Sequence, residues 1–184
     1  MKNRPQSSLD HKTEIQRDGE TPIENNRSYG RLIPNIYEKA LFADDISVFF
    51  SDCLKTIGET LEVSRIFLYE YREDSLVLKS IHEWTGGRLP AGRDVLMSIP
   101  KSRVPWWMDT ITGNEIIKYS DINEIPSAFE RRVLRQIGIK SLIAVPLYLS
   151  KRFYGFIGIA DNTRNRAWDD GITSIIMAAA QIMT

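Results

Sequence analysis

The segment that decides the fold is GIKSLIAVPLYLSKRFYGFIGIADNTRNRAWDD, residues 138–170. Residues 138–149 are almost continuously apolar, which is typical of a strand that is covered on both of its faces. After a short polar turn, residues 153–160 form a second apolar strand, in which Gly155 and Gly158 leave room for another group to approach closely. The segment therefore predicts an antiparallel hairpin at the centre of a domain.

The residues that follow this hairpin predict the last helix. A polar loop leads to Asp169, whose carboxylate can accept hydrogen bonds from the free N–H groups of a first helical turn. The apolar residues after it have the three-and-four spacing of one helix face: Ile172, Ile175, Ile176, Ala179, Ile182 and Met183. Because this stripe is unbroken up to Thr184, we expect the helix to continue in a longer parent protein.

The residues before the hairpin predict loops and short helices. Residues 83–100 are rich in glycine and proline and have no clear period, which predicts a loop. A short helix is expected from about Arg103, with an inner face of Val104, Trp107, Met108 and Ile111. Ser127 and Glu130 have the S-x-x-E spacing of a capping box, which predicts a second short helix with Phe129, Val133, Leu134 and Ile137 inside.

The first half of the chain predicts a helix and then a hairpin. Asp44 or Asp45 can cap the start of the helix. The residues after it form one apolar stripe: Ile46, Phe49, Phe50, Cys53, Leu54, Ile57 and Leu61. Residues 65–71 and 76–82 are strand-like and are joined by a short polar turn. Residues 1–35 are mostly polar or charged, so we expect a flexible N-terminal tail or linker there and a folded domain over residues 36–184.

These elements together predict an α+β fold with a central antiparallel sheet. The first and last helices both carry an apolar stripe, so the simplest arrangement packs them together on one face of the sheet. The loops and short helices between residues 83 and 137 would then cover the other face. A cavity beneath such a cover is where a small ligand would bind.

At this point the sequence resembles a known family, the GAF domains of signalling proteins. The resemblance runs from about Tyr37 to Met183 and is strongest in residues 138–170, with Val-Pro-Leu, a Gly-x-x-Gly strand and Arg-x-Trp-Asp before the last helix. Residues 105–126, PWWMDTITGNEIIKYSDINEIP, resemble the variant found in bacterial and archaeal sensor histidine kinases and diguanylate cyclases. The resemblance implies a GAF/PAS-like sensor domain, usually dimeric, whose terminal helices pass a signal to an output domain.

Composition narrows the possible partners. The chain has 184 residues and a formal net charge of zero, so it lacks the positive field that binds nucleic acid backbones. No apolar run has the length of about 20 residues that a membrane span needs, so we expect no membrane contact by this segment. A single cysteine excludes a disulfide framework within the chain, and a cytoplasmic location is expected.

The inventory of reactive residues predicts a domain that is not itself an enzyme. The chain has neither a G-x-S-x-G nucleophile elbow nor a phosphate-binding glycine loop. With one cysteine and two histidines, a protein metal site is not expected.

The cofactors known in the resembling family can be compared with individual residues. Bilin-binding members tether the pigment through a cysteine near the pocket, and Cys53 on the first helix does not match that placement. Haem-binding members use a histidine, for which His82 is the candidate near the cover. Members that bind cyclic nucleotides carry an Asn-Lys…Phe…Asp-Glu signature, from which DNTRNRAWDD, residues 161–170, departs. The cofactor is therefore left unknown.

Aromatic residues give the candidate ligand site. Trp84 and Trp106 both fall in the predicted cover, and Trp106 lies off the inner stripe to which Trp107 belongs. The full set of predicted ligand-binding residues is Trp84, Trp106, Phe129, Arg131, Ser141, Tyr148, Phe156 and Gly158. The pocket would take a flat or apolar ligand, with Arg131, Ser141 or Tyr148 supplying polar contacts. The alternative is that the aromatic residues only seal the face of the sheet.

Two functional hypotheses follow. In the first, the domain senses a small molecule and relays its presence through the terminal helices to an output domain such as a histidine kinase or a diguanylate cyclase. In the second, the domain binds no ligand and works as a dimerisation and relay module. Both predict a homodimer formed through the first and last helices.

Overall fold

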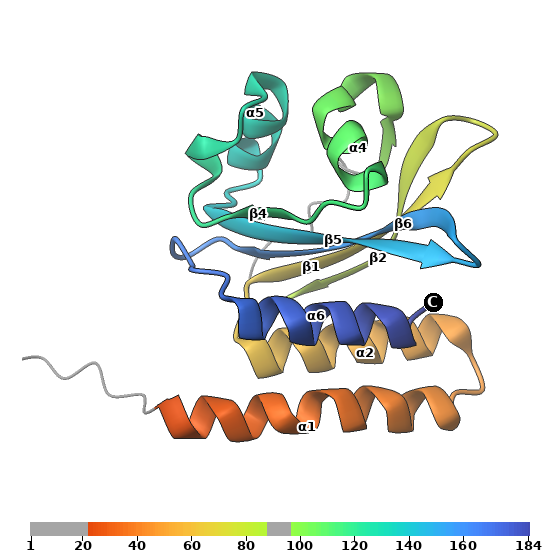
Figure 1. The fold of residues 1–184 in the computed structure, drawn as a ribbon, viewed down its shortest axis with the longest axis vertical. Coiled ribbons are helices and arrows are strands. Elements are labelled where there is room, and N and C mark those ends of the chain that lie inside the picture. Colours follow the sequence, from red (N-terminus) through yellow and green to blue (C-terminus); the bar gives the residue numbers. More distant parts are fainter. Residues whose placement is uncertain (1–21, 88–96) are drawn as a thin grey trace, which may run out of the picture.

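The computed structural model describes residues 22–87 and 97–184. An antiparallel six-stranded sheet lies between a layer of helices on one face and a layer of short helices on the other (Figure 1). The elements in chain order are α1 (Pro22–Leu41), α2 (Ile46–Leu61), β1 (Arg65–Arg72), β2 (Val77–Thr85), β3 (Ser98–Pro100), η1 (Lys101–Arg103), α4 (Pro105–Thr112), β4 (Ile117–Tyr119), η2 (Ile122–Glu124), α5 (Ala128–Gln136), β5 (Ser141–Leu149), β6 (Arg152–Asp161) and α6 (Asp170–Ile182).

The two predicted hairpins join at the centre of the sheet. The strand order is β3-β2-β1-β6-β5-β4, so β1 of the first hairpin pairs with β6 of the second. Successive residues of a strand point to opposite faces, and both faces of these central strands are buried. On β6, for example, Ile157 and Ile159 belong to the core beneath the helices, whereas Phe156 and Ala160 belong to the core beneath the cover.

The helical layer consists of α1, α2 and α6 (Figure 1). The helices α2 and α6 lie against the sheet, as predicted for the first and last helices, and α1 packs on their outer side. Asp45 and Asp169 cap the N-termini of α2 and α6 with their carboxylates, which confirms both predicted caps. None of the described helices combines the length and the hydropathy required to cross a membrane.

The predicted domain boundary at residue 36 is wrong, because α1 runs through it. Pro34 lies inside this helix, and the side chains of Leu32 and Ile36 are completely buried in the core of the helical layer. The apolar residues of α1 are sparse, so the local helical signal is weak, but these residues meet α2 and α6 and gain burial there. Residues 1–21 of the predicted tail lie outside the described residues.

The predicted loop over residues 83–100 is also wrong at both of its ends. β2 continues to Thr85, and Ser98–Pro100 returns as the edge strand β3 beside it. The extension of β2 carries Trp84 to the helical face, where its ring packs directly over Gly58 of α2. A Cβ atom at residue 58 would lie 2.1 Å from that ring, so the glycine is what lets α2 and β2 approach.

Candidate functional site

A cavity of about 60 Å³ lies between the sheet and the cover layer of α4 and α5. Aromatic rings of Phe67 and Tyr69 from β1, Trp107 from α4 and Phe156 from β6 form part of its wall. Tyr69 stacks on Phe156 with ring centroids 4.8 Å apart, and Trp107 lies 5.4 Å from Phe156. The other lining residues are Leu78, Ile99, Val104, Glu130, Val133, Leu134, Leu142, Ile143, Gly158 and Ile159.

Gly158 has no side chain to fill the space above the sheet at the base of this cavity. It pairs with Phe67 of β1 on one side and with Ala144 of β5 on the other. Across these three strands, the large ring of Phe67 therefore lies next to two small residues, Gly158 and Ala144. A Cβ atom at residue 158 would lie 3.0 Å from the Phe67 ring. A larger side chain there would therefore push the ring of Phe67 or occupy the space above it.

Within the part of the chain that the structure describes, Glu130 is the charged residue that lines the cavity, and only 3% of it is exposed. Its carboxylate accepts hydrogen bonds from the Ser127 hydroxyl and, at 3.4 Å, from the backbone N–H of Trp107. The predicted capping box therefore differs in detail: Ser127 is the N-cap residue of α5, but its side chain bonds Glu130 and caps no backbone N–H. Glu130 belongs to α5 and Trp107 to α4, so the hydrogen bond between them links the two short helices.

A buried ion pair lies on the same sheet. The Arg65 guanidinium donates to the Glu83 carboxylate at 3.0 Å, and both side chains are nearly inaccessible. Burial raises the pKa of the neighbouring Tyr69 hydroxyl, and the negative charge of Glu83 raises it further. The Tyr69 hydroxyl therefore stays protonated at neutral pH, and the cavity wall is uncharged there.

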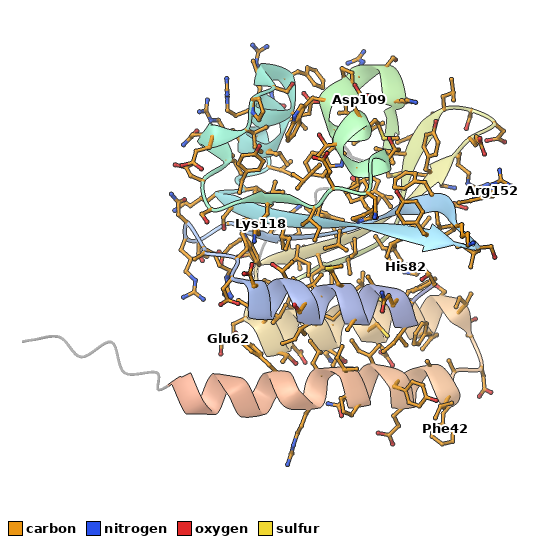
Figure 2. All side chains as sticks on the ribbon, in the orientation of Figure 1. Phe42, Glu62, His82, Asp109, Lys118 and Arg152 are labelled. Carbon is orange, nitrogen blue, oxygen red and sulfur yellow. The ribbon has the colours of Figure 1, made fainter. Side chains whose placement is uncertain are left out.

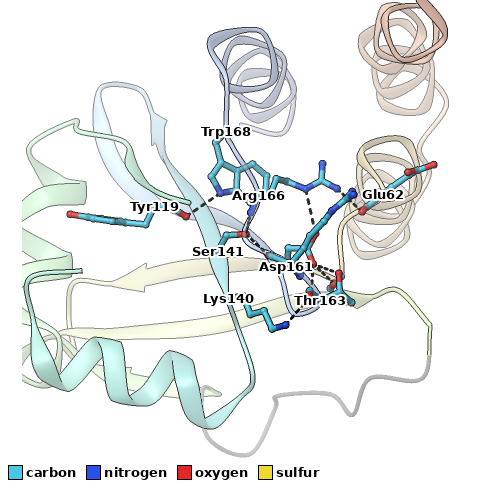
Figure 3. Close-up of polar contacts among 10 residues, drawn as sticks. Glu62, Tyr119, Lys140, Ser141, Asp161, Thr163, Arg166 and Trp168 are labelled. Carbon is cyan, nitrogen blue, oxygen red and sulfur yellow. Dashed lines mark hydrogen bonds and ion pairs between the residues drawn. The ribbon is translucent and has the colours of Figure 1, made fainter. Parts of the chain in front are cut away.

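A second polar centre lies at the end of β6 (Figure 3), and its residues are not among those that line the cavity. The Asp161 carboxylate, which is 1% exposed, accepts from the hydroxyls of Ser64 and Thr163 and from the backbone N–H groups of Thr163 and Arg164. It also pairs with the Arg166 guanidinium at 3.4 Å. Burial alone would raise the pKa of Asp161, but these hydrogen bonds outweigh it and lower the pKa to about 2.

The loop that begins at Asp161 connects the layers on both faces of the sheet. Arg166 donates to the carbonyl of Glu62 at the C-terminus of α2, and the Trp168 indole donates to the carbonyl of Tyr119 on β4 (Figure 3). On the cover side, the Asn162 amide donates to the carbonyl of Ile137 at the end of α5. The loop thus contacts α2, the cover and the start of α6 within a few residues.

Comparison with known proteins settles the family. A family model for the GAF domain matches residues 45–183. The chain belongs to the GAF domain family. It is 30% identical over 145 residues to the methanogenesis regulatory histidine kinase FilI of Methanothrix harundinacea (strain 6Ac). This match covers 74% of the chain but spans only 16% of the length of the kinase.

Solved structures show the same fold. The phycocyanobilin-bound GAF domain of a cyanobacterial phytochrome has a TM-score of 0.72 at 12% identity, and the match covers 84% of this chain and 91% of that one. The biliverdin-bound dark state of JSC1_58120g3 has a TM-score of 0.70 at 16% identity, covering 85% and 94%. The predicted α+β fold, with the terminal helices on one face and the cover on the other, is therefore confirmed.

The GAF domain brings two of the eight predicted site residues to its cavity, Phe156 and Gly158. Trp84 was predicted to share the cover with Trp106, and this is wrong, because Trp84 lies on the helical face of the sheet. Trp106 is in the cover but contacts Trp107 and Tyr119 by ring edges and does not line the cavity.

The remaining four residues also lie away from the cavity. Phe129 is 40% exposed, and Arg131 points its guanidinium to the carbonyl of Ile125. The buried Ser141 hydroxyl bonds the backbone of Arg164 and Arg166 in the loop after β6. The Tyr148 hydroxyl donates to the carbonyl of Thr112 at the end of α4. The predicted polar contacts to a ligand from Arg131, Ser141 and Tyr148 are therefore not supported.

Sequence reasoning missed most of the cavity wall. Trp107 belongs to the core on the cover side, as predicted, but it also lines the cavity, because the inner stripe of α4 faces the cavity itself. Trp106, the predicted pocket residue, does not line it. Phe67, Tyr69 and Leu78 read as ordinary strand residues. The useful signal was Gly158, since a glycine in a central strand marks a place where the face of the sheet is left open.

Proposed function

We propose that this GAF domain is a regulatory sensor that binds a small, mostly apolar molecule between its sheet and α4/α5. The observation that carries the proposal is the apolar cavity, partly open to solvent and lined by aromatic rings, on the cover face. The close-packed interior of a protein contains few cavities of this size. An apolar cavity excludes water and favours the binding of an apolar ligand. A volume of about 60 Å³ suits a molecule of only a few heavy atoms unless the cover moves.

We propose that the signal leaves through the helical layer. A ligand that favours one position of α4 and α5 would bias the loop after Asp161, since this loop is bonded to Ile137 and Tyr119 on the cover side. The same loop is bonded to the end of α2 and starts α6. The helix α6 would carry the bias to an output domain such as a histidine kinase or a diguanylate cyclase, in the cytoplasm.

The cofactors of other GAF domains fit these residues poorly. Cys53 lies on α2 beneath the opposite face of the sheet, and burial raises the pKa of its thiol to about 11, so it cannot tether a bilin in the cavity. His82 also faces α2, where its Nδ1 lies 3.5 Å from the Ser51 hydroxyl, so it does not face the cavity as a haem ligand would. Among the described residues that line the cavity, Glu130 is the charged one, and its sign opposes the phosphate of a cyclic nucleotide.

Filling the cavity should abolish ligand binding. The probe is 2-methyl-1-butene, a small hydrocarbon, and binding is measured by chemical-shift changes of cavity methyl groups and by the thermal midpoint. Wild type should respond. Gly158→Val should not, because the added methyl groups drive the Phe67 ring into the space, at a cost of about 1–3 kcal/mol in unfolding free energy.

The matched control is Ile157→Val on the helical face of the same strand, which should cost about 1 kcal/mol and leave probe binding unchanged. If wild type shows no response to the probe at saturating concentration, the sensor-cavity proposal fails. If Gly158→Val binds as well as wild type, the ligand lies elsewhere.

A second candidate function, a dimerising relay that needs no ligand, is favoured by an exposed apolar patch. The patch is the set of exposed apolar side chains at and beside the turn from α1 to α2: Tyr37, Leu41, Phe42, Ile46 and Val48. Phe42 is 77% exposed and Ile46 66% exposed, and Figure 2 places Phe42 at the end of α1, on the side away from the sheet. An apolar surface of this kind is typical of a protein interface, and we propose that it pairs two copies.

Charges placed in this patch should separate the dimer. The double variant Phe42→Asp/Ile46→Asp is expected to halve the mass measured by light scattering, because each new carboxylate would have to be buried at the interface. The unfolding free energy of the separated domain should stay within about 0.5 kcal/mol, since both side chains are exposed. Leu76→Asp, at an exposed position in the turn between β1 and β2, is the control and should leave the mass unchanged. A monomeric wild type at high micromolar concentration would refute the dimer.

A further inference from the structure

The indole N–H of Trp107 is buried in the described part of the protein without a hydrogen-bond acceptor. Trp107 is 9% exposed and lines the cavity. The backbone N–H of the same residue does have a partner, the carboxylate of Glu130 at 3.4 Å, so the local polar network stops short of the side chain. Trp168 provides the contrast, because its indole N–H donates to the carbonyl of Tyr119.

Such an orphaned donor is uncommon in a folded protein. Tryptophan side chains that are buried usually find an acceptor, since removing an N–H group from water without replacing its hydrogen bond is unfavourable. The other side chains that line the cavity with Trp107 are almost all apolar. Few other hydrogen-bond donors would therefore compete with the Trp107 N–H for the acceptor atom of a bound ligand.

We propose that the ligand of this cavity is a neutral molecule with an apolar body and one hydrogen-bond acceptor, such as a carbonyl or ether oxygen, which the Trp107 indole N–H meets. This inference rests on the proposed sensor function and adds the chemical class of the ligand. The apolar rings of Phe67, Tyr69 and Phe156 enclose the body of the ligand, and Trp107 selects molecules that carry the acceptor. An anionic ligand is disfavoured by Glu130, whose carboxylate already holds the neighbouring helix termini.

The test uses two probes of nearly equal shape, 2-butanone and 2-methyl-1-butene, which differ in carrying an oxygen or a methylene group. Both are titrated into wild type, Trp107→Phe and Trp106→Phe. Affinity is measured from thermal midpoints and chemical shifts, and the four indole N–H resonances are assigned from single Trp→Phe variants. Trp107→Phe keeps an aromatic ring in the wall and removes the donor, and Trp106→Phe makes the same change next to the cavity but outside it.

The expected result is a selective loss. In Trp107→Phe the affinity for the ketone should fall about tenfold relative to the alkene, which corresponds to one hydrogen bond from a buried donor. In wild type the ketone, and not the alkene, should shift the Trp107 indole proton downfield. Trp106→Phe should bind both probes as wild type does.

Two other outcomes separate the inference from the function on which it rests. If both probes bind wild type and Trp107→Phe with an unchanged affinity ratio, the cavity binds ligands but Trp107 does not select them, and the inference is wrong. If neither probe binds wild type, the sensor-cavity proposal fails, and the inference fails with it.

Discussion

Replacing Gly155 with alanine should lower the free energy of unfolding by about 3 kcal/mol or more. A Cβ atom on residue 155 would lie 1.9 Å from the carbonyl oxygen of Tyr69, which belongs to the backbone of the neighbouring strand β1. A side chain could rotate away from such a clash, but a strand backbone can move only if the pairing of β1 with β6 opens. The general preference of strands would predict the opposite sign, since a strand glycine is usually less stable than alanine.

The control for this variant is Gly158→Ala, which makes the same change three residues further along β6. Its Cβ atom would lie 3.0 Å from the ring of Phe67, a side chain that borders the cavity and has space to give way. Its unfolding free energy should therefore stay within about 1 kcal/mol of wild type. Chemical denaturation of the two variants measures the difference. Equal midpoints for both would show that the strands separate more easily than the structure indicates.

Asp161→Ala is the second substitution for which a large loss is expected, about 3 kcal/mol. The variant leaves the donors of Ser64 and Thr163 and the guanidinium of Arg166 without their shared acceptor in a buried setting. The link between the end of α2 and the start of α6 depends on this acceptor, because it holds Arg166 against Glu62 (Figure 3). Denaturation midpoints measure the loss, and a change below about 1 kcal/mol would refute the role of Asp161 as the centre of this network.

Asp161→Asn tests the charge separately, through the pH dependence of stability. Hydrogen bonds hold the pKa of folded Asp161 at about 2, below its ordinary value of 3.8, so the folded state favours the ionised form. The resulting stabilisation, about 2 kcal/mol, is fully present above about pH 5 and is lost as the pH falls through 4 toward 2. Asparagine does not titrate, so the unfolding free energy of the variant should not fall by this amount between about pH 5 and pH 2. If the unfolding free energies of wild type and variant fell in parallel over this pH range, the lowered pKa of Asp161 would not be the cause of the pH dependence.

The sequence by itself determined the architecture of the domain. The apolar hairpin of residues 138–160 and the caps Asp45 and Asp169 depend on local patterns and formed as predicted. The helix stripes also formed, except that Ile46 of α2 and Phe129 of α5, both predicted to face inward, are exposed. Local signals of this kind are reliable because backbone hydrogen bonding and one-sided burial act within a few residues of the chain. They were sufficient to place the terminal helices on one face and the short helices on the other.

The tertiary structure decided which residues meet. Whether Trp84 faces the helices or the cover depends on how far β2 continues and on the bulge in its pairing with β1, neither of which has a local sequence signal. The helix α1 gains its burial from α2 and α6, which lie beyond its own sequence. Trp107 became a cavity residue and Trp106 did not, because the inner stripe of α4 faces a floor opened by Gly158 on a distant strand. Contacts between residues far apart in the chain are set by packing across the sheet, and the same packing fixed the cavity and the network around Asp161.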